Sequence, residues 1–170
     1  MPTTITISVG IERLFTLVNQ RTLYIADQVD PELNMLMVDK IPITRDEYDA
    51  FYVLMKRAAT EVFKRISRLA FDLEDPFVYE TTVDDPDTEI NIVYKVVIPD
   101  GRQPAVIEPI LKDHIERAII AFIIMEWLRI KNIPNSSYYQ LDIDELKYAL
   151  DELSKLVNFG AKARLNYHYN

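Results

Sequence analysis

Two side chains in the second half of the chain have the chemistry that a catalytic site would need. Glu126 is the one charge in the apolar run Ala118 to Leu128, where a carboxylate either acquires a raised pKa or pairs with Arg129 one turn further on. His114, earlier in the same segment, could act as a base. No motif supports a reaction, because the sequence has no Cys, no G-x-S-x-G nucleophile and no P-loop. We expect a Glu126–Arg129 pair, a boundary position for His114 and no catalytic residue; an enzyme using Glu126 and His114 is the alternative.

The acidic stretch 84–89 is a candidate calcium site. An EF-hand loop needs Gly at its sixth position and Glu at its twelfth. Counted from Asp85, these positions hold Ile90 and Val96. We therefore expect a polar hairpin tip that contacts other molecules or is mobile, with no metal and no cofactor; micromolar calcium binding in calorimetry would contradict this. The acidic side chains of the stretch are Asp84, Asp85, Asp87 and Glu89.

Two groups of basic and aromatic side chains are candidates for contact with neighbouring subunits. Both contain Arg, and one contains Tyr, residue types that dominate binding energy at protein interfaces. For the helical group, a solvated face near a helix C-terminus is the alternative. The helical group consists of Lys56, Arg57, Lys64, Arg65 and Arg68. The tail group consists of Lys162, Arg164, Tyr167 and Tyr169.

The tail, 161–170, follows Gly160 and has Leu165 as almost its only aliphatic residue, so it cannot build a core of its own. We expect it to lie on an adjacent subunit, where its cations meet an acidic surface. A chain ending at Phe159 should then fold as a monomer that cannot enter particles. Moderate salt should weaken this assembly without abolishing it.

Composition limits the classes of function. A chain of 170 residues fits one domain, 1–170, and zero Cys suits a reducing compartment. The start MPTTITISVG lacks the pattern of a signal peptide. With 27 acidic and 19 basic residues, the net charge of −8 argues against a general nucleic-acid binder.

The element that must position these groups is the helix expected at Ile107 to Lys131. Its middle is apolar on every side, which requires cover from other elements or from lipid. A membrane span needs about 20 apolar residues, and flanking charges leave less than that here. We expect a central helix in a helical domain, with Trp127 as a large core residue rather than part of a binding cage.

Periodicity places the other elements around this helix. A three-to-four-residue apolar period predicts helices at 11–29, at 44–70 after the capping box Thr44/Glu47, and at 142–157. A period of two predicts a β-hairpin insertion, 76–99. The N-terminal segment 1–10 reads as a short strand or extended arm. The expected fold is mainly α (α+β): a four-helix domain around the central apolar helix, with an inserted β-hairpin and extended terminal arms.

The C-terminal third carries a resemblance to a known group of proteins. A long apolar helix ends in Glu126-Trp127, a break follows, then an acidic helix with ALDEL (Ala149 to Leu153), and a basic, tyrosine-bearing end. This resembles small virion proteins encoded beside the capsid and portal genes of phages of Bacteroides and relatives, including crAss-like phages. The tail departs from that pattern, since the proteins in question carry prolines and more Arg there.

The resemblance implies a head–tail connector or neck-ring subunit, assembled below the portal. Its implied partners are other copies in a homo-oligomeric ring, the portal protein and neighbouring neck or tail proteins, with no membrane and with nucleic acid at most passing through the lumen. It implies a virion location after synthesis in the host cytoplasm, and no enzymatic activity. A tail-terminator or another phage-encoded protein-binding module is the alternative.

Overall fold

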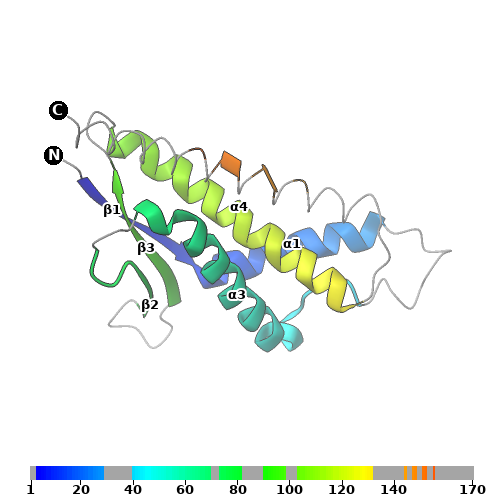
Figure 1. Ribbon diagram of the computed structural model, residues 1–170. Coiled ribbons are helices and arrows are strands. Elements are labelled where there is room, and N and C mark those ends of the chain that lie inside the picture. Colours follow the sequence, from blue (N-terminus) through cyan, green and yellow to red (C-terminus); the bar gives the residue numbers. More distant parts are fainter. Residues whose placement is uncertain are drawn as a thin grey trace, which may run out of the picture.

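A computed structural model describes residues 3–28, 40–69, 73–81, 90–98 and 103–131, together with 144, 147, 148, 151, 152 and 155. Helices predominate, and they accompany one small antiparallel sheet (Figure 1). The helices are α1 (Ile11–Gln28), α3 (Tyr48–Ile66) and α4 (Pro104–Ile130), with short 3-10 turns η1 (Arg45–Glu47) and η2 (Ser67–Leu69) flanking α3. The strands are β1 (Thr3–Gly10), β2 (Phe77–Thr81) and β3 (Ile90–Ile98).

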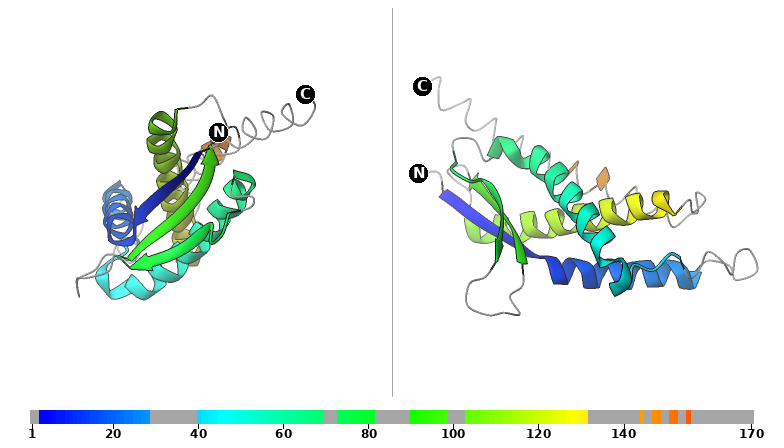
Figure 2. Two further views of the ribbon diagram at one scale, coloured as in Figure 1. Left: turned by 90° about the vertical axis from the view of Figure 1, so that its left-hand side faces the viewer. Right: turned by 90° about the horizontal axis from the view of Figure 1, so that it is seen from below.

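The sheet has the order β1-β3-β2, and both neighbouring pairs are antiparallel. Tyr94 lies between Ile7 and Phe77, so one face collects the alternate apolar residues of all three strands. This face is turned toward the helices, which extend away from it (Figure 2). Tyr94 is fully buried there and donates its hydroxyl hydrogen bond to the Ala59 carbonyl at 3.2 Å.

The N-terminal segment Thr3–Gly10 is a strand of this sheet. Of the two interpretations of the sequence, the short strand is confirmed and the extended arm is wrong. The hairpin prediction is confirmed for β2 and β3, yet the hairpin is part of the body of the fold instead of an insertion beside it. The physical reason is the alternation itself. Ile5, Ile7 and Val9 form an apolar face that needs cover, and pairing with β3 places that face under the helices.

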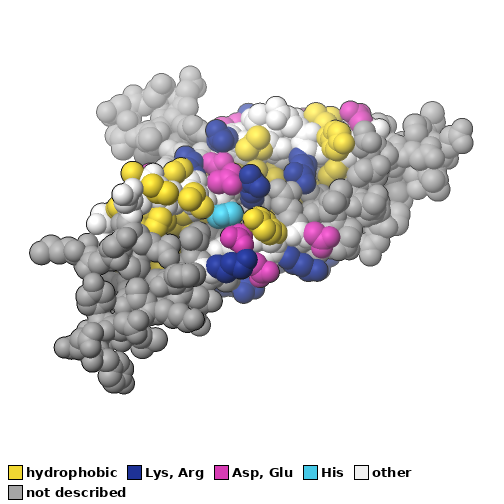
Figure 3. Space-filling model, turned by 90° about the horizontal axis from the view of Figure 1, so that it is seen from above, with side chains coloured by type: hydrophobic (Ala, Val, Ile, Leu, Met, Phe, Trp, Pro, Cys, Tyr) yellow, Lys and Arg dark blue, Asp and Glu magenta, His cyan; other side chains and the backbone are white. Residues whose placement is uncertain are grey.

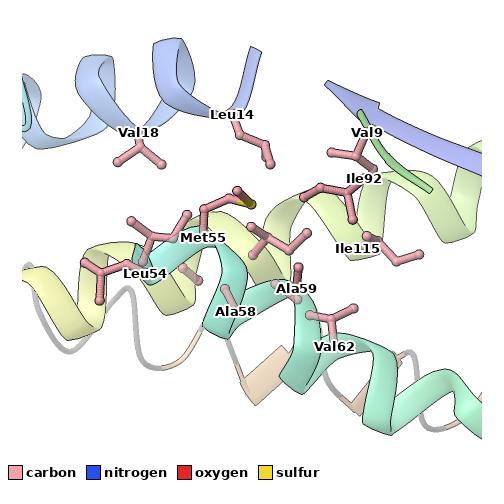
Figure 4. Packing of buried hydrophobic residues seen from close by; sticks show 14 of the residues in the cluster. Val9, Leu14, Val18, Leu54, Met55, Ala58, Ala59, Val62, Ile92 and Ile115 are labelled. Carbon is pink, nitrogen blue, oxygen red and sulfur yellow. The ribbon is translucent and has the colours of Figure 1, made fainter. Parts of the chain in front are cut away.

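The central helix is confirmed, and it begins at Pro104, three positions before the expected Ile107. Proline suits this first helical position because its missing N–H would have no partner there. The helix packs against α3, α1 and β1, and its buried positions run from Leu111 to Leu128. Figure 4 shows buried side chains of the sheet and of all three helices meeting, including Val9, Leu14, Met55, Ala59 and Ile115.

The helix at 44–70 begins with the expected capping residues, although its first turn is the 3-10 turn η1. The Glu47 carboxylate accepts hydrogen bonds from the Thr44 backbone N–H at 2.9 Å and from Thr44 Oγ1 at 2.5 Å. The α-helical part ends at Ile66. Its predicted apolar stripe is confirmed at the buried positions Phe51, Met55, Ala58, Ala59, Val62 and Ile66.

The connector before η1 is held between α1 and α4 by side-chain hydrogen bonds to its backbone. Asn19 Nδ2 donates to the Ile43 carbonyl at 2.8 Å, and the Thr22 hydroxyl accepts from the Ile43 N–H at 3.1 Å. Trp127 Nε1 donates to the Ile41 carbonyl at 2.8 Å. A short non-helical segment therefore becomes part of the core.

For the last predicted helix, 142–157, six residues are described, and each has helical backbone. The rest of that segment, the hairpin tip 82–89 and the tail 161–170 are not among the residues that the structure describes. Their predicted roles stay predictions. Within the described ranges, no helix combines the length and the apolar composition needed to cross a membrane.

Candidate docking groove between α3 and α4

An open groove of about 580 Å³ runs between α3 and α4. Its apolar floor comes from both helices, because each turns a stripe of small or apolar residues toward the other. Polar and charged side chains surround this floor. The floor consists of Val62, Ala118, Phe122 and Met125. The rim consists of Lys56, Arg57, Thr60, Glu61, Arg65, Glu126 and Arg129.

The rim carries an excess of positive charge. Glu126 is bound to Arg129 at 2.5 Å, and Glu61 is bound to Lys64 outside the lining at 2.5 Å. Both carboxylates are therefore already partnered. Within the described part of the chain, Arg57 and Arg65 are exposed and have no ion pair. Two guanidinium groups with free donors thus face the same opening.

Lys56 adds a cation held beside aromatic rings. Its Nζ lies 4.5 Å from the centroid of the Tyr52 ring and 5.7 Å from that of Tyr79. An ammonium group at such distances over a ring face is attracted by the ring quadrupole. The contact orients Lys56 along α3 toward the β2 side of the molecule.

The structure brings together part of the predicted basic row. Lys56, Arg57 and Arg65 line the groove, whereas Lys64 points outside it and is paired with Glu61. For Arg68 only the backbone, within η2, is described. The four tail candidates Lys162, Arg164, Tyr167 and Tyr169 belong to the part of the chain for which no structure is described.

The two candidate catalytic side chains are not brought together. They stand twelve positions apart on one straight segment of α4, which corresponds to about 18 Å of helix rise. Glu126 has the predicted partner, Arg129. The His114 ring lies 6.4 Å from the Tyr148 ring, and its buried Nδ1 has no hydrogen-bond partner among the described residues. This places His114 at the edge of the core, as predicted.

The sequence analysis missed Glu116 as a buried charge. Glu116 is 8% exposed, and its Oε2 lies 3.4 Å from Arg13 Nη2 on α1. From the sequence alone, Glu116 counted as one of the charged residues that flank the apolar run Ala118 to Leu128. Its spacing of three and seven positions from Ile119 and Ile123 places it on their buried helix face, and this signal could have identified it.

A second charged cluster joins α1 to the start of α3. Arg45 binds the Glu12 carboxylate with both terminal nitrogens, and the Tyr48 hydroxyl donates to Glu12 Oε1 at 2.8 Å. The hydrogen bonds from Arg45 lower the pKa of Glu12. Burial, followed by the hydrogen bond to Glu12, raises the pKa of Tyr48 to about 12. The Arg45 guanidinium also stacks over Phe15 at 4.5 Å. Because every member has a partner, this cluster is structural.

Within the described ranges, no group of three or more His, Cys, Asp or Glu side chains is placed so that it could hold a metal ion. A comparison with protein-family models, with curated proteins and with solved structures finds no match. The chemistry of the groove and the resemblance of the C-terminal third are therefore the grounds for a function. An apolar floor beside Arg57 and Arg65, which have no ion pair among the described residues, suits an acidic protein surface.

Proposed function

We propose that this chain is a structural subunit of a tailed-phage neck, assembling as a homo-oligomeric ring below the portal and contacting the portal and neighbouring neck or tail proteins. The supporting observation is the groove, where Arg57 and Arg65 border an apolar floor and have no ion pair with any residue that the structure describes. The resemblance of the C-terminal third supports the same class. The subunit would act in the virion after synthesis in the host cytoplasm.

The charge of the chain explains why such a groove matters for assembly. Copies with a net charge of −8 repel one another, so contact between them requires a local concentration of cations. The groove supplies this on an otherwise acidic protein. An incoming acidic surface with apolar residues would bury the floor and pair with the arginines, which form planar, bidentate hydrogen bonds with carboxylates.

The proposed architecture of the subunit is the full four-helix arrangement. In it, 142–157 forms a fourth helix beside α4, consistent with the contact between Tyr148 and His114. The helices and the sheet then form a rigid body, and assembly uses surfaces on that body together with the tail. The mechanism requires no cofactor and no catalytic step.

Charge reversal at the groove tests this function. We expect the double variant Arg57→Glu/Arg65→Glu to fold normally and to lose the oligomers that the wild type forms in native mass spectrometry. Incorporation into particles should fall by at least tenfold. Arg117→Glu is the matched control, because it makes the same change on α4 outside the groove and breaks only an exposed pair with Asp113 on its own helix.

Masses measured on the purified protein and on virions decide between the outcomes. Multiple copies in the virion and groove-dependent oligomers support the neck subunit. A chain present in virions whose assembly is insensitive to the double variant contradicts the role of the groove. A monomer absent from virions overturns the proposed function itself, while one or a few copies at the tail would instead support a tail-terminator or another binding module.

A further inference from the structure

Strand β1 is an edge strand that lacks the usual protection against pairing with another chain. It is eight residues long and contains no charged residue and no proline, in a protein with 46 charged residues (27 + 19). Natural edge strands are usually short or carry Lys, Pro or a bulge. The opposite edge, β2, follows this rule: it has five residues, includes Glu80 and is preceded by Pro76. Among the described residues no strand pairs with the outer side of β1, and the contrast with β2 makes β1 the better candidate for a further strand.

Exposed apolar side chains lie on the helix that packs over this edge. α4 contacts β1, and Val106 and Ile110 on its first turns are 53% and 45% exposed. They are four positions apart, so they share one face of the helix. Figure 3 shows hydrophobic side chains gathered at the end of the molecule where α4 begins, and Figure 2 shows α4 behind the β1 side of the sheet. This end of α4, a helix that contacts β1, therefore has apolar surface that a bound segment could cover.

The tail sequence has the pattern that such a strand requires. From Arg164 to Asn170 it alternates strictly, with Leu165, Tyr167 and Tyr169 on one side and Arg164, Asn166, His168 and Asn170 on the other. β1 alternates in the same way: Ile5, Ile7 and Val9 are buried, while Thr4, Thr6 and Ser8 are exposed. Tyr beside Ile or Val, and Asn or Arg beside Thr or Ser, are favourable neighbours across strands.

We infer that the outer edge of β1, which pairs with no other strand among the described residues, binds residues 164–170 of a second copy of this chain as a fourth strand, with Leu165, Tyr167 and Tyr169 on the side of the buried residues of β1. Main-chain hydrogen bonds supply affinity, and the alternation fixes the register. Each subunit then has one donor tail and one acceptor edge, a head-to-tail arrangement that forms a ring where the rotation between subunits closes. The inference rests on the proposed assembly function and names one of its contacts.

Two full-length variants separate the donor from the acceptor. Thr6→Lys places a cation on the exposed side of β1, next to the basic side of an incoming tail. Tyr167→Glu/Tyr169→Glu removes the apolar side of the tail and leaves β1 intact. We expect each variant alone to be monomeric in native mass spectrometry at a concentration where the wild type is oligomeric. Thr16→Lys, the same change at an exposed threonine of α1, should assemble like the wild type.

Mixing the two variants in equal amounts is the decisive measurement. The mixture contains one working tail and one working edge per pair, so we expect complexes of two chains that neither variant forms alone. A mixture that stays monomeric, with a lowered thermal midpoint for the tail variant, would show that the tail binds its own β1 and would overturn the inference. Variants that assemble like the wild type overturn it too, and they leave the neck function standing. A wild type that is monomeric in isolation also overturns it, while its copy number in virions tests the function separately.

Discussion

Trp127 shows how one side chain can join a helix to a non-helical segment. Its indole is 2% exposed, and its N–H reaches the Ile41 carbonyl of the connector that crosses from α1 to η1. The Lys131 ammonium lies 4.2 Å from the ring centroid and covers it at the end of α4. Trp127 therefore contributes buried area and also satisfies a backbone carbonyl that has no place in a helix or a sheet.

We predict that Trp127→Ala lowers the free energy of unfolding by about 3–5 kcal/mol, the usual cost of truncating a large buried aromatic residue. Trp127→Phe should lose less, since it keeps most of the apolar contact and removes the hydrogen bond. Urea titration measures both values. A loss below about 1 kcal/mol for the alanine variant would contradict the buried position.

The cluster of Glu12, Arg45 and Tyr48 predicts a dependence of stability on alkaline pH. In the unfolded chain a tyrosine loses its proton near pH 10, whereas folded Tyr48 keeps its proton to about pH 12. The unfolded state therefore binds fewer protons between these values, and the contribution of Tyr48 to stability is present below pH 10 and is lost as pH rises toward 12. Burial also raises the pKa of Tyr79 and Tyr94, so they act in the same direction.

The Tyr48→Phe variant isolates the contribution of Tyr48. We expect its free energy of unfolding to fall less steeply than that of the wild type between pH 10 and pH 12, while Tyr79 and Tyr94 still contribute. Chemical denaturation at several pH values gives both slopes. Equal slopes would show that the Tyr48 hydroxyl is not held by burial and by Glu12.

Among the elements, α3 depends most clearly on local signals. At its start, the Glu47 carboxylate accepts hydrogen bonds from the Thr44 N–H and hydroxyl. The Glu47 N–H in turn donates to the Thr44 carbonyl at 3.1 Å in the 3-10 turn. The hydrogen bond from Thr44 lowers the pKa of Glu47, which keeps the carboxylate charged at this helix end. The positive end of the helix dipole favours the same charge. Residues adjacent in sequence thus determine where the helix begins.

We predict that Thr44→Ala lowers the free energy of unfolding by about 1 kcal/mol, the typical value for loss of a capping hydroxyl. Thr44→Ser keeps the hydroxyl and should be close to the wild type. Thermal and urea denaturation of the three proteins measure the difference. If the alanine and serine variants are equally stable, the hydroxyl does not contribute to the start of the helix.

For the whole molecule, the two proposed contact surfaces lie on different parts of the body. The groove is formed by α3 and the second half of α4, while β1 is an edge of the sheet and lines no part of the groove. A subunit can therefore engage one neighbour through its edge and another surface through its groove at the same time. The proposed ring, with other neck proteins as further partners, would need two such separate contact surfaces on each subunit.

Local sequence patterns are sufficient to predict the start of α3 and the central position of α4. The all-round apolar run Ala118 to Leu128 demands cover whatever surrounds it, and Thr44/Glu47 marks a helix start through contacts three residues apart. The pair Glu126–Arg129 was predictable for the same reason, because its partners share one helix turn. Local periodicity and spacing carry this information directly.

Contacts between residues distant in sequence are visible in the folded structure alone. Ile5 and Val96 are neighbours across strands although 91 positions separate them, and this pairing turned an apparent arm into an edge of the sheet. Glu116 became a buried charge because α1 brings Arg13 to it, and Arg57 and Arg65 became a groove rim because α4 supplies the opposite wall. Periodicity identifies the apolar face of an element. Which other element covers that face depends on the packing of the whole chain. The same packing decides the surroundings of Ile5, Glu116, Arg57 and Arg65.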